Sequence, residues 1–426
     1  MSPITRLNIA DGVYFNSVRD NRFKTMKLSA NLFVPLSAET ASANALLAGV
    51  LSRSCQAYPD FTALSRKLSA LYGAELNVSV NKAGETQVIS VSASGLDDRY
   101  ALGGESVAAE LSALLCSVIF EPNVRDKAFV SEEVEQERRQ LLDVIDSEYN
   151  EKRIYANGRM TEIMCTDEVF GIKRYGTAAD IRAVTPVSLY GTWQKLLQNA
   201  VVEIMYIGDS EPDKAMAVFA DSFGKIVRTP VALHTEVIRV AGEVKRETEE
   251  IDVSQAKLVM GFRVGTAIPE KEAVAASLMC ALLGGTATSK LFCNVREKQS
   301  LCYYCSARYD KYKGVMIVDS GVETENIEKL ERGILKEITD MQNGVISDFE
   351  MESTKMAMIN IYQSSNDTVS GIETWYSSQL LQNGFRTIEE ACAEINAVTK
   401  EEIVAAANKL QLDTVYVLKN HQEENA

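Results

Sequence analysis

The chain has 426 residues, of which 46% are hydrophobic, and its formal net charge is −15. At roughly 150 residues per domain, this length predicts two or three domains. The acidic balance gives no electrostatic support for binding nucleic acid or an anionic membrane, so a basic or unfolded peptide is the better-matched partner. The N-terminus lacks a signal-peptide pattern and no apolar run is long enough to span a bilayer, so we expect a cytoplasmic location without a membrane partner.

The first half of the chain predicts strands and helices in mixed order. Strands are expected at 12–18 and 24–34, and in the second of them apolar residues alternate with polar or small ones. The mostly apolar stretch 41–55 predicts a buried helix. The order lacks a strict strand-helix-strand rhythm, which favours an α+β fold with antiparallel sheets packed against helices. The remaining elements expected here are a helix at 59–72, a hairpin at 73–80 and 87–94, a helix ending at Phe120, a charged helix at 131–149, and a helix with a strand within 188–207.

The second half repeats the pattern of the first. The segments IRAVTPVSLYGTWQKLLQNAVVEIMYIGD, from Ile181, and INAVTKEEIVAAANKLQLDTVYVLKN, from Ile395, share Ala-Val-Thr, a Lys-Leu pair and an apolar strand ending. A repeat spanning about half the chain indicates a duplicated domain rather than a solenoid. We therefore predict an N-terminal domain of residues 1–228 and a C-terminal domain of residues 229–426, joined by a linker within 228–239.

Residues 284–322 combine a small-residue segment, a short charged helix and a strand pair. The helix carries Arg296 on its polar side. After Ser300 the periodicity changes to two, which predicts a strand that includes Tyr303. Considered alone, Arg296 would more often be a solvated helix charge and Tyr303 a half-buried strand aromatic.

The eight cysteines are scattered, several within apolar helical runs, which fits reduced and buried thiols. Cys302 and Cys305 form the one C-x-x-C, and a single such pair without a nearby histidine is a weak signal for a metal or redox site. On a regular strand the two would face opposite sides, so we favour a core role. A thiol nucleophile at either position is a further alternative, but it has no histidine nearby to activate it.

The sequence VREKQSLCYY, followed by a hairpin and a glycine-containing strand end, resembles the second half of insulinase/pitrilysin-type zinc peptidases, the inverzincins. In that family an arginine and a tyrosine seven residues apart grip the substrate near the scissile bond, and Arg296 and Tyr303 match this pair. The resemblance covers essentially the whole chain. It implies two duplicated α+β domains in the manner of a processing-peptidase subunit.

The zinc motif of that family is missing from this sequence. Inverzincins bind zinc through H-x-x-E-H on a helix and a distal carboxylate, whereas this chain has only two histidines, His234 and His421. By resemblance, the places of the histidine, glutamate and histidine are taken by Ala45, Ala48 and Gly49. None of these can bind zinc or move a proton.

The distal ligand is missing as well. SEEVEQERRQLLDVIDSEYN resembles the helix that carries the third ligand, and aligning Glu137 and Arg138 with the family places Val144 at the ligand position. The glutamates at the start of this helix are expected to form a solvated face that complements the helix dipole. They are Glu132, Glu133, Glu135 and Glu137.

The resemblance implies a catalytically incomplete subunit of a heteromeric zinc peptidase. A homologous subunit bearing H-x-x-E-H would hold the zinc, and this chain, without a cofactor of its own, would contribute Arg296 and Tyr303 as hydrogen-bond donors to the substrate. A peptide substrate would bind extended and add a strand to an exposed sheet edge. The alternative, from the binding class, is a non-enzymatic scaffold or peptide-holding protein of the same fold.

Overall fold

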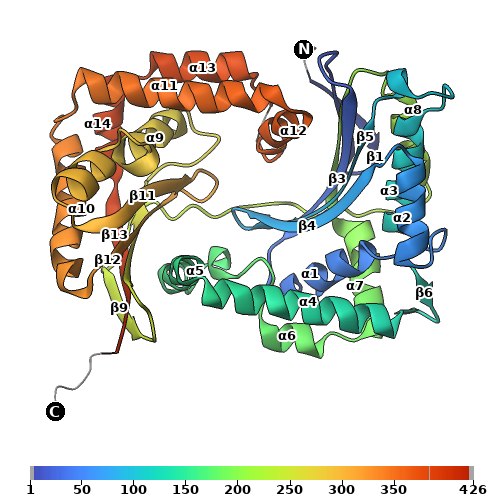
Figure 1. The fold of residues 1–426 in the computed structure, drawn as a ribbon, viewed down its shortest axis with the longest axis horizontal. Coiled ribbons are helices and arrows are strands. Elements are labelled where there is room, and N and C mark those ends of the chain that lie inside the picture. The colour runs from blue at the N-terminus through green and yellow to red at the C-terminus, as the bar shows by residue number, and fades with distance from the viewer. Residues whose placement is uncertain (1–3, 383, 422–426) are drawn as a thin grey trace. The chain divides into compact units, whose positions relative to one another are not determined.

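The computed structural model describes residues 4–382 and 384–421, which divide into two compact units (Figure 1). The boundary between His234 and Thr235 falls within the predicted linker. The predicted division at 228/229 assigns one continuous segment to each domain. In the structure the units exchange segments: 146–171 from the first half belongs to unit 2, and 364–385 from the second half belongs to unit 1. Unit 1 comprises the described parts of Met1–Ile145, Ile172–His234 and Ser364–Phe385, and unit 2 those of Asp146–Gly171, Thr235–Gln363 and Arg386–Ala426.

Unit 1 is built on a six-stranded sheet in the order β1-β2-β8-β3-β5-β4. Apolar residues at alternate positions of β3, such as Met26, Leu28 and Ala30, face the main core, as the predicted alternation requires. Phe33 of the same strand faces the opposite side of the sheet and a second, smaller core. The strands are β1 (Thr5–Ala10), β2 (Val13–Arg19), β3 (Thr25–Pro35), β4 (Glu75–Ala83), β5 (Thr86–Leu96) and β8 (Val201–Gly208); β6 (Val124–Arg125) and β7 (Ala128–Phe129) form a separate pair.

Helices cover both faces of this sheet. The main core lies between the sheet and helices that include α1, α3 and α7, whereas α12, from the exchanged segment, packs against β3 and β8 on the other face. The helices of unit 1 are α1 (Ala41–Leu51), α2 (Phe61–Ala70), η1 (Asp98–Tyr100), α3 (Val107–Phe120), α6 (Ala178–Ala183), α7 (Pro186–Asn199), α8 (Asp213–Gly224), η6 (Ser365–Asp367) and α12 (Val369–Ser377), and α4 (Ser131–Asn150) begins in this unit.

Unit 2 is built on a five-stranded sheet in the order β11-β12-β10-β13-β9. Its main core lies against helices that include α9, α10 and α14, and α5, from the exchanged segment, packs against β10 and β13 on the other face. The strands are β9 (Lys245–Glu250), β10 (Ala256–Arg263), β11 (Cys302–Asp310), β12 (Val315–Val322) and β13 (Gln411–Lys419). The helices are α5 (Lys152–Met164), η2 (Val169–Gly171), α9 (Glu272–Cys280), the π-helical η3 (Ala281–Gly285) and η4 (Leu291–Lys298), η5 (Thr324–Asn326), α10 (Ile327–Gln342), α11 (Asp348–Ser364), α13 (Ile388–Ala397) and α14 (Lys400–Lys409).

The two sheets share one strand order, which is the structural form of the sequence repeat. Across the sheet, unit 1 has the order β2-β8-β3-β5-β4 and unit 2 has the matching order β9-β13-β10-β12-β11. Unit 1 has β1 as an additional edge strand. The last strand of each unit inserts between two earlier ones, β8 between β2 and β3 and β13 between β9 and β10. The pairs β2–β8 and β9–β13 are parallel, whereas the other pairs in both sheets are antiparallel. The predicted α+β class is therefore confirmed, with one parallel pair in each sheet that sequence periodicity cannot reveal.

The repeated Ala-Val-Thr has a local physical cause. In each copy the valine ends one helix and the threonine caps the next: Val184 and Thr185 connect α6 to α7, and Val398 and Thr399 connect α13 to α14. Both threonines accept a hydrogen bond from the third residue of the following helix, in a capping box. The repeat thus preserves a helix-helix corner. Within the described part of the chain, no helix has the length and apolar character needed to cross a membrane.

Candidate functional site

The three positions predicted to replace a metal motif lie on α1. Ala45 and Ala48 are 5% and 3% exposed and belong to the main core of unit 1. Gly49 faces α4 so closely that a Cβ built there would lie 2.6 Å from Oε2 of Glu137. A larger side chain at position 49 would therefore require the Glu137 carboxylate to move.

The carboxylates of α4 near Gly49 already accept hydrogen bonds from neighbouring side chains. Glu137 is 7% exposed, and its Oε1 accepts a hydrogen bond of 2.6 Å from Nη1 of Arg53. Ser54 donates to Oε1 of Glu133 at 2.7 Å. Burial raises the pKa of Glu133, and the hydrogen bond from Ser54 offsets this only in part.

The expectation of a solvated acidic face on α4 is therefore partly wrong. Glu132 and Glu135 are exposed, but Glu137 is buried and Glu133 is half-buried. The reason is that Arg53 neutralises Glu137 and so makes its burial tolerable. Val144, at the predicted position of the lost distal ligand, is 41% exposed.

These residues do not fit a zinc ion. The short side chains at the motif positions offer no ligand atom, and the nearby carboxylate is paired with a guanidinium. Among the residues that the structure describes, no group of three or more histidine, cysteine, aspartate or glutamate side chains is placed to hold a metal.

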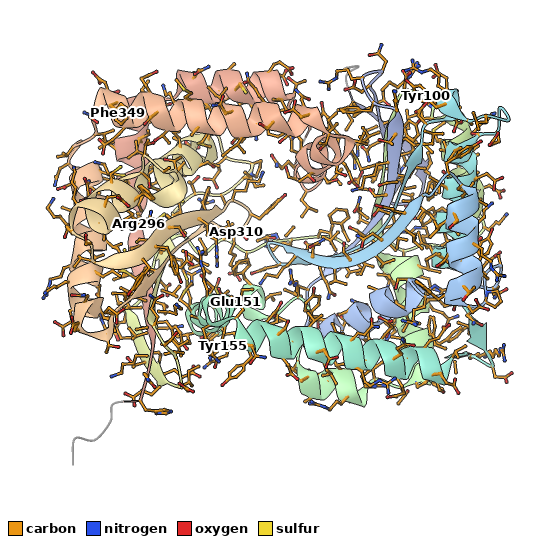
Figure 2. The ribbon with its side chains drawn as sticks, viewed as in Figure 1. Tyr100, Glu151, Tyr155, Arg296, Asp310 and Phe349 are labelled. Atoms are coloured by element: carbon orange, nitrogen blue, oxygen red, sulfur yellow. The ribbon has the colours of Figure 1, made fainter. Side chains whose placement is uncertain are left out.

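Arg296 lies on η4 in unit 2, where Figure 2 labels it. Its side chain is 37% exposed, with Nη1 3.3 Å from Oε1 of Glu297 and the guanidinium carbon 4.7 Å from the ring centroid of Phe292. Both contacts are with residues of the same short segment. They leave the guanidinium free to turn toward a ligand, because exposed pairs of this kind contribute little free energy.

Tyr303 lies on β11, an edge strand of the unit 2 sheet, and is 59% exposed. Its hydroxyl donates a hydrogen bond of 2.6 Å to Oε1 of Glu323, which raises the pKa of Tyr303. The register of β11 on β12 shifts between Cys302 and Tyr304, so Tyr303 is the extra residue of a β-bulge. Such bulges redirect side chains at sheet edges.

The structure thus places both predicted site residues in unit 2, on two elements that pack together, η4 and β11. Each donor contacts a carboxylate, Arg296 that of Glu297 and Tyr303 that of Glu323. Among the contacts of the described residues, none joins the two side chains. Sequence reasoning missed Glu323. It lies 20 residues after Tyr303 in the sequence, and only the pairing of β11 with β12 brings the two side chains together.

The bulge also corrects the expected orientation of the two nearby cysteines. Cys302 pairs with Val322 and Cys305 with Ser320, and residues two apart on β12 face the same side of the sheet. Cys302 and Cys305 therefore face the same side, not opposite sides. Cys305 is buried, as predicted, whereas Cys302 is half-buried.

Comparisons with known proteins agree on the family. The sequence model described as "Peptidase M16 inactive domain" matches residues 183–358. A "probable inactive metalloprotease YmfF" from Bacillus subtilis is 30% identical over 408 residues, which cover 96% of each chain. A solved structure of a conserved protein from Enterococcus faecalis has 28% identity and a TM-score of 0.91 over the full length of both chains.

A further solved structure, titled as a peptidase M16 inactive domain from Pseudomonas fluorescens, has a TM-score of 0.82 at 16% identity and covers 99% of this chain and 100% of that one. At this identity the likeness shows the fold alone. The relative from Bacillus subtilis, matched over nearly the full length of both chains at 30% identity, shows the family. The chain belongs to the insulinase-type, or M16, peptidase family, among its inactive homologues.

Proposed function

We propose that this chain is the catalytically incomplete subunit of a heteromeric zinc peptidase and works with a homologous subunit that carries H-x-x-E-H. The observation that carries the proposal is a contrast between two places in the chain. At Gly49 the metal motif has been replaced and the neighbouring Glu137 is paired with Arg53. Arg296 and Tyr303, in contrast, are both at least one-third exposed and available as donors.

In this proposal the partner supplies the zinc and the attacking water, and this chain supplies electrostatic help. Arg296 donates to the peptide carbonyl oxygen as negative charge develops on it, and Tyr303 provides a second donor. Tyr303 has one hydroxyl proton, which it donates in a hydrogen bond to Glu323. The hydroxyl must therefore turn from Glu323 to the substrate when the substrate binds.

The substrate class that fits is an extended peptide. Each sheet ends in an edge strand, β4 in unit 1 and β11 in unit 2, and these strands hold equivalent places in the repeated order. Only one of the nine residues of β4 is buried. A peptide could add to such an edge through main-chain hydrogen bonds, which carry little sequence preference, and the net charge of −15 favours basic peptides.

The test is coexpression with an H-x-x-E-H homologue from the same genome, followed by peptide-cleavage kinetics of the purified complex. Arg296→Ala and Tyr303→Phe should each lower turnover by roughly 10²-fold, the usual effect of losing one donor to a developing oxyanion. Complex formation should be unchanged. Unaltered kinetics in a correctly assembled complex would contradict the assigned roles.

Two substitutions serve as matched controls. Tyr72 is another exposed tyrosine whose hydroxyl donates a hydrogen bond to a glutamate, Glu105, and Tyr72→Phe removes that hydroxyl. Arg332→Ala removes an arginine whose side chain is 71% exposed and lies 3.9 Å from Glu328. Both should leave turnover within about twofold of wild type, since neither belongs to the proposed site.

A second measurement concerns the chain by itself. After dialysis it should hold far less than one zinc per chain and cleave no peptide, because Ala45, Ala48 and Gly49 provide no ligand. A zinc content near one per chain, lost together with activity on chelation, would refute the proposal. Tight binding of extended peptides by the lone chain, with no homologue bound in cells, would favour the scaffold alternative.

A further inference from the structure

The bulge in β11 brings two thiols onto one face of the unit 2 sheet. Tyr303 is the extra residue, so Cys302 and Cys305, three apart in sequence, oppose Val322 and Ser320, which are only two apart on β12. Two residues of a strand span about 6.6 Å, so the Cα atoms of the two cysteines that oppose Val322 and Ser320 should be separated by about that distance. This value is at the upper end of the roughly 4.4–6.8 Å between Cα atoms that disulfides bridge.

The surroundings of the two thiols differ in a way that suits two different roles. Cys305 is 6% exposed and part of the main core of unit 2, whereas Cys302 packs against that core and is only half-buried. A reagent can therefore reach Cys302 first. Cys305 lies on the same face but is buried.

The electrostatics of the pair agree with this geometry. The pKa of Cys302 is lowered, foremost by a hydrogen bond from Cys305 and further by the charge of Arg296, against an opposing effect of burial. The pKa of Cys305 is raised well above its usual range, by the same hydrogen bond and by burial. Cys302 is thus the better thiolate and nucleophile, and Cys305 remains a protonated thiol.

We infer that Cys302 and Cys305 form a redox-active dithiol, in which Cys302 attacks a low-molecular-weight disulfide and Cys305 resolves the product. The Cys302 thiolate displaces one thiolate from the disulfide and forms a mixed disulfide. Cys305 loses its proton to solvent and attacks the Cys302 sulfur, which expels the second thiolate. Two electrons pass from the dithiol to the small disulfide, which leaves as two thiols.

Closure of this disulfide would act on the strand that presents Tyr303. The extra residue of the bulge lies between the two sulfurs in sequence, so linking them fixes the backbone on both sides of it. The thiol chemistry itself requires neither a partner nor a substrate. Its test is therefore independent of the proposed peptidase role.

Trypsin offers a direct assay, because it cleaves after Lys298 and Arg308 and leaves both cysteines in one peptide. The reduced chain is equilibrated in oxygen-free glutathione buffers of increasing oxidised fraction, quenched with acid, blocked with N-ethylmaleimide and analysed by mass spectrometry. As the oxidised fraction rises, the peptide 299–308 should lose both maleimide labels, and its mass should be that of the unlabelled dithiol peptide minus two hydrogens. Dithiothreitol should restore labelling at both sites.

The other half-buried cysteines, Cys293 and Cys392, provide an internal reference. The 302–305 pair should reach half-oxidation at a smaller oxidised fraction than either of them needs for half-conversion to a mixed disulfide. In Cys305→Ala the mixed disulfide at Cys302 should persist, and in Cys302→Ala the buried Cys305 should stay reduced. Wild-type chain that keeps both thiols at every ratio, or that stops at the mixed disulfide, would overturn the inference.

Discussion

The two units share a strand order but cover the second face of their sheets in different ways. In unit 1, α12 contributes Ile372 and Tyr376 to an apolar cluster with Phe33 and Met205. In unit 2, α5 places Met160 and other apolar residues near β10 and adds a polar network beside them. The strand order therefore does not determine how a face is covered, which depends on the side chains that the face presents.

The polar network in unit 2 is centred on Asp319 of β12. Arg153 of α5 forms an ion pair with it, Asn157 of α5 donates to it at 3.3 Å, and Ser306 of β11 donates to it at 2.6 Å. Burial acts to raise the pKa of Asp319, but these hydrogen bonds and the charge of Arg153 outweigh it, so the pKa lies below its ordinary value. α5 is therefore held to its sheet by charge as well as by apolar contact.

A second buried network holds the segment that follows α5. Glu168 accepts from Arg263 at 2.6 Å and forms an ion pair with Lys313 at 2.7 Å, and Arg263 also donates to Asp413 at 2.8 Å. The side chains of Arg263 and Lys313 are 3% and 0% exposed. Removing Glu168 would leave two buried cations poorly compensated, which is costly. This explains why 146–171 belongs to unit 2.

The strongest test of the exchange is to produce residues 1–228 and 229–426 as separate chains. The first fragment lacks α12 and the second lacks α5, so each has one sheet face uncovered and apolar. We expect neither to fold cooperatively alone and the two to form a folded complex when coexpressed, as measured by size exclusion and near-ultraviolet circular dichroism. Cooperative unfolding of each isolated fragment would instead support two self-sufficient halves divided at 228/229.

Single truncations on the exchanged helices should act on different units. Ile372 and Met160 are both 0% exposed, and replacing either with alanine should cost about 2–5 kcal/mol through lost burial and a residual cavity. Ile372→Ala should expose unit 1 amides to hydrogen exchange, and Met160→Ala those of unit 2. A change confined to the other unit in either variant would contradict the assignment. Met356→Ala, at a side chain that is 63% exposed, is the control.

Asp319→Asn should weaken unit 2 by a smaller amount. Asp319 is 3% exposed in its side chain but Arg153 is 46% exposed, so the guanidinium left behind can be hydrated and the loss should be about 2 kcal/mol. The folded pKa is depressed, so this stabilisation is present above the ordinary pKa near 3.8 and is lost as the pH falls through the folded value. Urea unfolding at several pH values measures it. Asp340→Asn, which removes a more exposed pair with Lys336, should cost less than about 1 kcal/mol.

Much of the fold could be predicted because its signals are local. β2 and β3 lie within one residue of the expected 12–18 and 24–34, and the alternating Met26, Leu28 and Ala30 of β3 face one core because side chains on one face of a strand repeat every second residue. The Ala-Val-Thr repeat identified the duplication because capping by Thr185 and Thr399 depends only on neighbouring residues. In contrast, α5, α12 and the inserted last strands are placed by contacts distant in sequence, which periodicity does not encode.

The site shows the same division between local and distant information. The absence of an H-x-x-E-H motif is visible in the sequence itself, because its two histidines, His234 and His421, are far apart in the chain. The pairing of Glu137 with Arg53 could not, because the two are 84 residues apart. The bulge at Tyr303 could not either, since it is defined by the register against β12. The roles of Arg296 and Tyr303 remain a prediction from family resemblance.

The smallest effect expected is at Glu133 in unit 1, and its sign is opposite to that at Asp319. Burial raises the folded pKa of Glu133 above its ordinary value near 4.5, so the unfolded chain ionises first as the pH rises. Glu133 therefore lowers stability progressively as the pH increases through that window. Glu133→Gln removes the titration and keeps an acceptor for Ser54. The variant should match wild type near pH 4 and become more stable than wild type by pH 7.

Urea unfolding of both proteins across this range checks the sign, with Glu132→Gln as the control because Glu132 is an exposed neighbour on the same helix. A variant that is equally stabilised at every pH would mean that packing, not ionisation, distinguishes glutamine from glutamate here. If Glu133→Gln instead becomes less stable than wild type as the pH rises, Glu133 is stabilised as an anion, by Arg53 or another cation. Glu133 would then stabilise unit 1 as an anion, as Asp319 stabilises unit 2, and the difference in sign between these two buried carboxylates would be lost.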